Sequence, residues 1–408
     1  MNKLSFLSLL LPSFLLASFS GVLLDETSGK PIENALVIDG NTTATSDTNG
    51  SFTIENKDTR VHIKAYGYRP LVIETNTTQN SFKLQAIKVK ALYLTFWGAS
   101  NNSKTLKNIL KLIDETQANA IVMDIKNEFG STSFLTGFAQ ANSYGAQKHR
   151  TNRNIQKFIA EMKKHHIYTI ARIVTFKDEI QAAHNPDYAL KRDNNGTIWR
   201  NHDKMAWVDP FDTRAHKYTI RIAEEAAKVG FDEINFDYIR FPAKKGLRFS
   251  KANTQKNRVK TIERFLDSAK ENLQPYGVFI SVDTYGNILW SKKDDNNIGQ
   301  MLLSLTKHSD YIAPMLYPSG FAPGSFHFDH PADHPYSVIY RSLKNIKDRV
   351  DITRVRPWLQ YFKDYTCKRR AYKKFEIQEQ IRATEQLNTN GWMMWSPSSR
   401  YNKEYLAK

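Results

Sequence analysis

Apolar residues in the larger, C-terminal part of the chain fall into short runs separated by segments with helical spacing. Most of the runs are almost continuously apolar, as expected for parallel strands that are covered on both faces. These predicted strands span residues 91–97, 120–126, 168–176, 233–241, 278–285, 311–317, 355–362 and 392–396.

Between the predicted strands, apolar residues recur at positions i, i+3, i+4 and i+7, which predicts amphipathic helices. The first of these follows a capping residue, Ser103, and places Leu106, Ile109 and Ile113 on one face. The same spacing marks residues 155–162, 259–273 and 298–305. Strands that alternate with helices over residues 89–408 predict an α/β protein with a (β/α)₈ (TIM) barrel. A doubly wound open sheet is the alternative, but the chain lacks a Gly-rich nucleotide loop.

Residues 21–88 follow a different rhythm, with short alternating runs between Gly, Asn, Asp and Thr turn residues. This pattern predicts a small antiparallel β-sandwich. The phrases at 29–35, 47–52 and 66–68 resemble the carboxypeptidase-regulatory-like module found before many exported proteins. The resemblance implies a spacer or adhesion module, and no catalytic residue is predicted in it.

Residues 1–20 have the pattern of a secretory signal peptide. Lys3 precedes an apolar run, and the small residues Ser18 and Ser20 fit a cleavage site before Gly21. A transmembrane anchor is the alternative, but Pro12 interrupts the apolar run early. We therefore expect a periplasmic or secreted protein with no stable membrane insertion after the signal peptide is removed.

The chain is strongly basic, with 58 Lys and Arg against 41 Asp and Glu and a formal net charge of +17. Such an excess indicates an anionic partner, and export argues against nucleic acid. Basic residues are dense at 244–270 and 363–374, after the fourth and seventh predicted strands. The hypothesis is an anionic or envelope-associated glycan that these loops help to hold. The single cysteine, Cys367, excludes an intramolecular disulfide framework, and no cofactor is expected.

Functional groups of a (β/α)₈ barrel lie at the C-terminal ends of the strands. Asp237 and Asp283 lie near the ends of the fourth and fifth predicted strands. Glycosidases use two carboxyl groups about 5 to 9.5 Å apart, a separation that neighbouring strand ends provide. We predict Asp237 as the primary catalytic carboxylate and Asp283 as its partner, with Asp124 and Glu128 as alternatives for the partner.

Other residues at or near strand ends form the predicted sugar-binding set, because flat rings stack on sugars and polar groups fix their hydroxyls. The set comprises Trp97, Asp124, Lys126, Arg172, Asp209, Arg240, Tyr285, Tyr317, Gln360 and Trp395. A group of His and Asp residues at 327–334 offers possible metal ligands. Its irregular spacing favours an ordered loop beside the substrate instead, and no metal site is predicted.

Six motifs in order resemble the bacterial glycoside hydrolase domain once catalogued as a domain of unknown function, DUF4015, in the barrel glycosidase superfamily. They are MDIK (123–126), ARIVTFKD (171–178), WVDPFD (207–212), FDYIRFP (236–242), APMLYPS (313–319) and GWMMW (391–395). The resemblance covers residues 90 to about 400. It implies a (β/α)₈ fold and glycosidase activity, and it fixes no substrate.

The segment FDEINFDY (231–238) is similar to the fourth-strand signature of chitinase-like barrels. Asp232, Asn235 and Asp237 occupy its aspartate positions, but Ile239 replaces its essential acid, so substrate-assisted chemistry is not expected. Two other functions therefore stay open beside an exported glycoside hydrolase. One is a catalytically silent carbohydrate-binding or adhesion protein, and the other is a metal-dependent polysaccharide deacetylase that would use the His and Asp loop.

Overall fold

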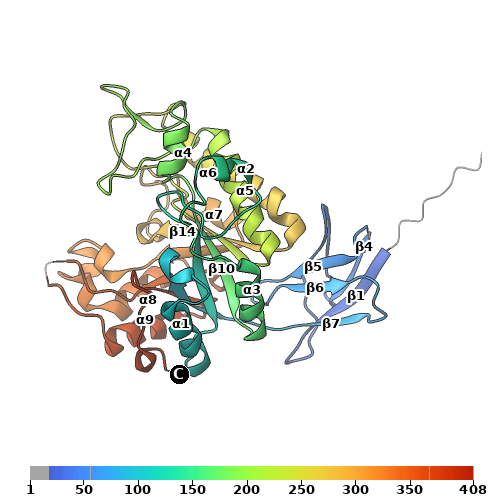
Figure 1. The fold of residues 1–408 in the computed structure, drawn as a ribbon. Helices are drawn as coiled ribbons and strands as arrows, with labels where there is room; N and C mark the ends of the chain where they lie inside the picture. The colour runs from blue at the N-terminus through green and yellow to red at the C-terminus, as the bar shows by residue number, and fades with distance from the viewer. Residues whose placement is uncertain (1–17, 56, 367, 408) are drawn as a thin grey trace, which may run out of the picture.

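The computed structural model describes residues 18–55, 57–366 and 368–407, and it forms a small β-domain followed by a barrel (Figure 1). Residues 1–17 of the predicted signal peptide and Cys367 lie outside the described residues. None of the described helices combines the length and the apolar character needed to cross a membrane.

Eight parallel strands close into a barrel in the order β10-β12-β14-β15-β16-β17-β8-β9. They are β8 (Val89–Leu94), β9 (Ala120–Lys126), β10 (Tyr168–Val174), β12 (Glu233–Asp237), β14 (Phe279–Tyr285), β15 (Tyr311–Met315), β16 (Trp358–Gln360) and β17 (Gly391–Trp395). Each falls on a predicted strand, so the predicted (β/α)₈ fold is confirmed. Several strands end earlier than predicted, because the chain turns there into the loops above the barrel.

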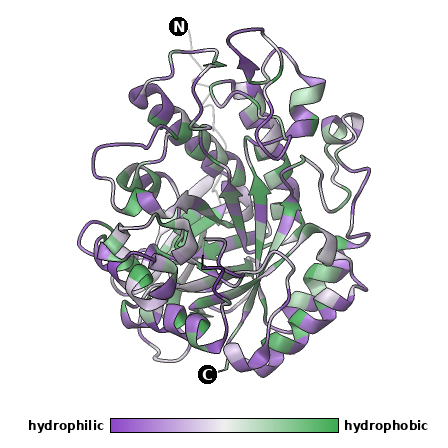
Figure 2. Cartoon of the chain, turned by 90° about the vertical axis from the view of Figure 1, so that its left-hand side faces the viewer, coloured by the Kyte–Doolittle hydropathy of each residue, from purple (hydrophilic) through white to green (hydrophobic). Residues whose placement is uncertain are grey.

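Helices surround the strands, whose apolar residues form the centre of the molecule (Figures 1 and 2). The longer helices are α1 (Lys104–Glu115), α3 (Ile155–Lys164), α5 (Thr213–Val229), α6 (Gln255–Leu273), α7 (Leu302–His308), α8 (Pro335–Lys344) and α9 (Lys374–Gln386). The loops add α2 (Ala139–Ser143), α4 (Glu179–His184) and a two-stranded sheet of β11 (Lys191–Arg192) and β13 (Leu247–Arg248). Ser103 caps α1 as predicted. The helix predicted at 298–305 begins only at Leu302, because Met301 has an extended backbone.

The N-terminal domain contains two small sheets, with strand orders β4-β1-β7 and β3-β2-β5-β6. Its strands are β1 (Ser18–Asp25), β2 (Leu36–Asp39), β3 (Thr42–Thr45), β4 (Ser51–Glu55), β5 (Arg60–Lys64), β6 (Leu71–Glu74) and β7 (Ser81–Leu84). The predicted antiparallel sheets are confirmed, with two differences. The mostly polar β3 gave no apolar signal, and β1 pairs with β7 in parallel.

The N-terminal domain packs against the N-terminal end of the barrel strands. Lys64 forms an ion pair with Asp310 at 2.9 Å and donates to the Val278 carbonyl at 3.1 Å. The Gly67 amide donates to the hydroxyl of Tyr311, the first residue of β15, at 3.1 Å. These contacts leave the opposite end of the barrel open for a functional site.

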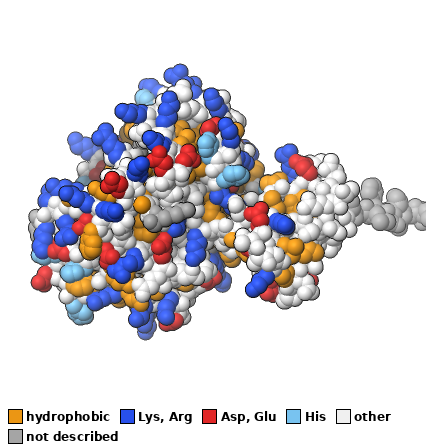
Figure 3. Space-filling model, turned by 90° about the horizontal axis from the view of Figure 1, so that it is seen from below, with side chains coloured by type: hydrophobic (Ala, Val, Ile, Leu, Met, Phe, Trp, Pro, Cys, Tyr) orange, Lys and Arg blue, Asp and Glu red, His pale blue; other side chains and the backbone are white. Residues whose placement is uncertain are grey.

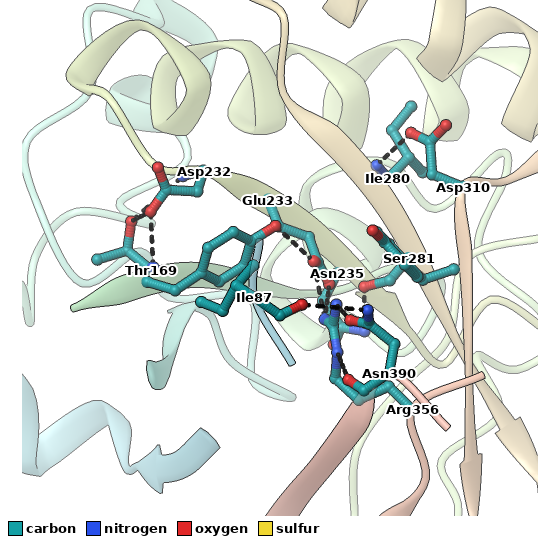
Figure 4. Close-up of polar contacts among 12 residues, drawn as sticks. Ile87, Thr169, Asp232, Glu233, Asn235, Ile280, Ser281, Asp310, Arg356 and Asn390 are labelled. Atoms are coloured by element: carbon teal, nitrogen blue, oxygen red, sulfur yellow. Dashed lines mark hydrogen bonds and ion pairs between the residues drawn. The ribbon is translucent and has the colours of Figure 1, made fainter. Parts of the chain in front are cut away.

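The lower part of the barrel interior holds a buried ion pair between Arg356 and Glu233 (Figure 4). Arg356 donates to both carboxylate oxygens of Glu233 at 2.9 and 2.8 Å, and the Tyr168 hydroxyl donates to Oε2 at 2.9 Å. The guanidinium also donates to the Asn390 side chain at 2.8 Å. Because these charges compensate each other, neither group needs a ligand as its partner.

Candidate active site

A cavity of about 340 Å³ opens at the C-terminal end of the barrel strands. Carboxyl, guanidinium and aromatic groups converge on it from different strands and loops. Its polar and aromatic lining consists of Glu128, Arg172, Asp237, Tyr238, Arg240, Asp283, Tyr285, Asn287, Tyr317, Phe321, Trp358, Tyr365 and Trp395.

The strand register brings the two predicted catalytic residues together. The pairing of β12 with β14 ends with Phe236 opposite Val282, so Asp237 and Asp283 are the next residues on adjacent strands. Both carboxyl groups line the cavity, and the charge of Asp237 influences the ionisation of Asp283. On the other side of β12, Val174 of β10 lies opposite Asp237.

Arg172 on β10 connects three carboxylates at the base of the cavity. Its Nη1 donates to Asp124 Oδ1 at 2.5 Å, and its Nη2 donates to Glu128 Oε1 at 3.1 Å. The same guanidinium donates to Asp237 Oδ2 through Nε at 3.1 Å and through Nη2 at 2.5 Å. Arg172 is buried, so this cation compensates the acids in a place that water reaches poorly.

Asp237 is the last residue of β12 and is held from both sides. Its Oδ2 accepts from Arg172, and its Oδ1 accepts from the Tyr238 amide at 2.6 Å. Tyr238 has a left-handed backbone, with φ of 49°, which is uncommon for a residue with a large side chain. The strained turn directly after the strand fixes the Asp237 carboxylate at the edge of the cavity.

Asp283 occupies a different environment on β14. Its Oδ1 accepts from Asn235 Nδ2 at 2.9 Å and from Trp358 Nε1 at 2.7 Å, and none of the described cations forms an ion pair with it. Burial and the neighbouring charge of Asp237 raise the pKa of Asp283 well above its ordinary value. Asp283 is therefore the carboxyl group of this cavity that is suited to keep a proton.

The two alternative partners differ from Asp283. Burial acts to raise the pKa of Glu128, but Arg172 and local hydrogen bonds outweigh it and leave that pKa below its ordinary value. Burial raises the pKa of Asp124 to about 6 against the opposing effect of Arg172. Asp124 lies beneath the cavity lining, where the Tyr93 hydroxyl and Arg172 occupy its two oxygens. Neither environment combines a retained proton with access to a substrate.

Aromatic side chains form the walls of the cavity. Trp395 stacks on Tyr93 with ring centroids 4.0 Å apart and lies 5.1 Å from the Arg172 guanidinium. Arg240 lies over the ring of Tyr285 at 4.9 Å, and Tyr285 is 42% exposed. Flat, partly exposed faces next to charged groups are suited to binding sugar rings.

The cavity brings together seven predicted site residues, namely Arg172, Arg240, Tyr285, Tyr317, Trp395 and the two catalytic candidates Asp237 and Asp283. Trp97 lies outside the lining on the surface, 70% exposed. Lys126 is buried in an ion pair with Asp178 at 2.9 Å, and Asp209 accepts from the Phe211 and Ser250 amides. Gln360 is buried and bonds to Ser319 through both ends of its amide. These last three side chains hold loops in place beside the site.

Trp358 and Tyr365 line the cavity although they are absent from the predicted binding set. Trp358 is one of the aromatic residues that the sequence places on or near strand ends, and in the structure it begins β16. Tyr365 belongs to a loop without a strand signal. The aromatic character of both residues was the available signal, but only the closed barrel shows which rings face inward.

Several basic residues of the segments 244–270 and 363–374 form ion pairs within the protein. Arg258 on α6 is buried in a bidentate ion pair with Asp295, at 2.7 and 2.8 Å. Lys368 pairs with Asp333 at 2.6 Å, and Arg370 pairs with Glu376 at 2.7 Å. These basic residues therefore contribute less free positive charge to the rim than the sequence count indicates.

Two side chains of the His and Asp loop at 327–334 contact neighbouring protein groups. Asp333 pairs with Lys368 and Arg370, and His334 stacks on Phe328 with centroids 3.9 Å apart. Among the described residues, no three His, Cys, Asp or Glu side chains are grouped so that they could hold a metal ion.

Comparisons with known proteins agree with this architecture. A profile of the DUF4015 family, described as a putative glycosyl hydrolase domain, matches residues 91–401. A hypothetical protein from Ruminiclostridium thermocellum ATCC 27405 is 33% identical, with 47% of this chain and 96% of that chain covered and a TM-score of 0.41. No curated protein matches the chain.

Two further structures are similar at lower identity. The PgaB (BpsB) glycoside hydrolase domain from Bordetella bronchiseptica is 12% identical, with 79% of this chain and 99% of that chain covered and a TM-score of 0.57. A chitinase from Bacteroides thetaiotaomicron is also 12% identical, with 78% and 93% covered and a TM-score of 0.47. The likeness to PgaB shows a shared fold. Because the family profile spans the whole barrel, from β8 to beyond β17, the chain belongs to the DUF4015 family of putative glycosyl hydrolase domains.

Proposed function

We propose that this protein hydrolyses glycosidic bonds in a polysaccharide or an envelope glycan. One observation carries the proposal: Asp237 and Asp283 line the same cavity from adjacent strands but lie in opposite electrostatic environments. Two carboxyl groups whose surroundings favour different protonation states are what acid-base cleavage of a glycosidic bond requires.

Asp283 serves as the general acid. Asn235 and Trp358 both donate to its Oδ1, so Oδ2 is left to carry a proton toward the glycosidic oxygen. Burial and the charge of Asp237 raise the pKa of Asp283, which favours the form that carries this proton. Ile239, at the acid position of the chitinase-like signature, is buried and apolar, so the acid in this barrel must come from another strand.

Asp237 supplies the negative charge. It forms an ion pair with Arg172 and faces the positive charge that develops at the anomeric carbon in an oxocarbenium-like transition state. Trp395 and Tyr285, which both line the cavity, offer ring faces for the sugar.

The second candidate is a carbohydrate-binding protein without catalytic activity, and the absence of an acid at Ile239 favours it. Both candidates use the same cavity and the same aromatic walls. They differ in whether Asp283 transfers its proton, which a measurement of product formation distinguishes.

The test is reducing-end release from a panel of storage and envelope polysaccharides. We expect Asp237→Asn and Asp283→Asn each to lower the rate by about 10² to 10⁴-fold, the range for loss of a positioned acid or base. Asp348→Asn is the matched control, since Asp348 is exposed and outside the cavity lining. Full activity of either cavity variant would refute the assignment. Binding of a polysaccharide by the unmodified protein without any release would instead support the carbohydrate-binding function.

A further inference from the structure

A second cavity, of about 650 Å³, adjoins the first. Asn287 and Phe321 line both cavities, so the two lie side by side above β14 and β15. Neighbouring cavities are suited to neighbouring residues of a chain, and a cavity of this volume is within the range of ligand sites.

Aromatic rings connect the two cavities. Trp290 and Phe326 meet edge to face with centroids 5.2 Å apart, and Phe326 meets Phe321 at 5.0 Å. Trp290 is 43% exposed, and its Nε1 donates to Ser342 Oγ at 3.3 Å, which fixes the orientation of the ring. The second cavity therefore presents a fixed and accessible aromatic face.

The loop that carries Phe326 adopts a strained conformation. Phe326 and His327 both have left-handed backbones, with φ of 59° and 62°. Arg341 holds the loop through a hydrogen bond of 2.7 Å from Nη1 to the Phe326 carbonyl. A left-handed backbone costs free energy in residues other than glycine, and two adjacent ones are uncommon. Such strain concentrates at binding sites.

The charge of the second cavity differs from that of the first. Its lining includes Arg341, Lys344 and His327 and contains no carboxylate, whereas three carboxyl groups line the first cavity. Arg341 and Lys344 are exposed on α8, and neither forms an ion pair with any residue that the structure describes. Arg341 lies over the Phe328 ring at 4.9 Å and Lys344 over the Tyr340 ring at 5.8 Å, which leaves both cations without a carboxylate partner among the described residues. Such cations beside a fixed aromatic face match a ring that carries a negative charge.

We infer that the second cavity is a subsite for a carboxylate-bearing sugar, a uronic acid residue of the glycan chain. The ring of that residue stacks on Trp290, and Arg341 and Lys344 bind its carboxylate. The role of this subsite rests on the proposed function. The subsite would hold an anionic glycan while a neighbouring glycosidic bond lies at Asp237 and Asp283.

The test measures binding without turnover, so its result is independent of hydrolysis. Protein labelled with ¹⁵N-tryptophan is titrated at pH 7 and constant ionic strength with sodium D-glucuronate, D-glucose and glucose 6-phosphate. Trp290→Phe identifies the Trp290 indole signal. We expect glucuronate to shift that signal at concentrations about tenfold lower than glucose, the gain from charge-assisted contacts.

Arg341→Gln with Lys344→Gln is expected to remove the preference for glucuronate over glucose. Because Arg341 also holds the Phe326 loop, Lys344→Gln alone serves as a second variant, with a loss of about threefold. Lys347→Gln is the matched control, since Lys347 is exposed nearby and outside the lining. Equal shifts with glucose and glucuronate, no shift with either, or a preference that survives the double change would overturn the inference. A stronger response to glucose 6-phosphate would overturn the choice of a carboxylate.

Discussion

The two catalytic candidates are chemically identical aspartates, and their neighbours give them different roles. Asp237 shares Arg172 with Asp124 and Glu128, whereas Asp283 faces the neutral donors of Asn235 and Trp358. A cation close to a carboxyl group favours its charged form, and burial without a cation favours its neutral form. The difference in electrostatic surroundings is therefore a property of the strand register, which decides which neighbours each carboxyl group meets.

The raised pKa of Asp283 predicts a stability that depends on pH. In the unfolded chain this aspartate loses its proton near pH 4, but the folded protein retains it until the higher, folded pKa is reached. The folded state therefore binds more protons over that interval, and its stability falls as pH rises. Asp283→Asn lacks this loss, so its stability relative to the unmodified protein should increase from pH 4 towards neutral pH. Urea unfolding at several pH values measures the difference, and a difference independent of pH would contradict the assignment.

The same proton predicts how activity depends on pH. A general acid must be protonated, so hydrolysis should decline as pH rises through the pKa of Asp283. The alkaline limb of the pH-rate profile should be absent from the residual activity of Asp283→Asn and present in the control Asp348→Asn. An identical alkaline limb in Asp283→Asn would assign the acid to another group.

Arg172 predicts a large cost in stability. Replacing it by methionine leaves Asp124 and Asp237 buried without their cation, which typically costs about 3 to 5 kcal/mol. Arg153→Met is the matched control, because Arg153 is exposed, and a surface change of this kind should stay within about 0.5 kcal/mol. Urea unfolding measures both variants. A cost for Arg172→Met as small as that of the control would show that the three carboxylates do not depend on this cation.

At the scale of elements, closure of the barrel depends on the pairing of β17 with β8. Gly391 begins β17 opposite Val89 and has a left-handed φ of 83°. A Cβ atom at this position would lie 2.0 Å from the Val89 carbonyl oxygen. Only glycine permits the two backbones to approach so closely, and this approach closes the barrel between its first and last strands.

Gly391→Ala should therefore destabilise the protein by about 4 kcal/mol or more, because the obstructing atoms belong to the backbone of a central strand. Gly145→Ala separates this contact from simple conformational strain. Gly145 has a φ of 74°, but a Cβ atom there would meet nothing within 4 Å, so we expect a cost of about 1 to 2 kcal/mol. Thermal unfolding of the two variants provides the comparison. Equal costs would mean that strain alone, and not the contact with β8, makes Gly391 necessary.

At the scale of the whole molecule, the two ends of the barrel have different surroundings. The N-terminal domain covers the lower end through Lys64 and Gly67, and the cavities occupy the upper end. Lys and Arg side chains are spread over the larger lobe and form no single patch on the face shown in Figure 3. On this face the positive charge is therefore distributed and not concentrated at one place.

The cleavage site of the predicted signal peptide stays a prediction. We propose that the protein is exported and that cleavage occurs before Gly21, where Ser18 and Ser20 are the small residues that a signal peptidase requires. This cleavage removes residues 18–20, which pair with β4, including Phe19, which packs against Phe52 and Phe82 with centroids 5.8 Å away. Mass spectrometry of the protein secreted from a bacterial host gives the terminus, and a mature chain that retains residues 18–20 would contradict this cleavage site.

Much of the fold could be predicted because its signals are local. Near-continuous apolar runs identified all eight barrel strands, and the cap at Ser103 identified the start of α1. The ends of strands were less predictable, since residues 238–241 continue the apolar pattern of β12 while the chain turns at Tyr238. Apolar residues in a loop that folds back onto the barrel have the same spacing as residues in a strand.

The candidate site was predictable only in part. The rule that functional groups lie at strand ends selected Asp237, Asp283 and Arg172, and it also selected Gln360 and Lys126, whose side chains bond within the protein. Trp358 lines the cavity although it begins its strand. Position along a strand is a local property, but the direction and partners of a side chain depend on the neighbouring strands.

The sequence by itself determined the alternation of strands and helices, the order of the two domains and the set of charged residues at the barrel's upper end. Tertiary structure alone decided that Arg172 forms an ion pair with Asp237, that Asp283 has no ion-pair partner among the described residues, and that a second, basic cavity adjoins the first. The physical reason is that secondary structure follows from the spacing of apolar residues along one segment. Protonation and binding follow instead from contacts between segments far apart in the chain, which exist only once the barrel has closed.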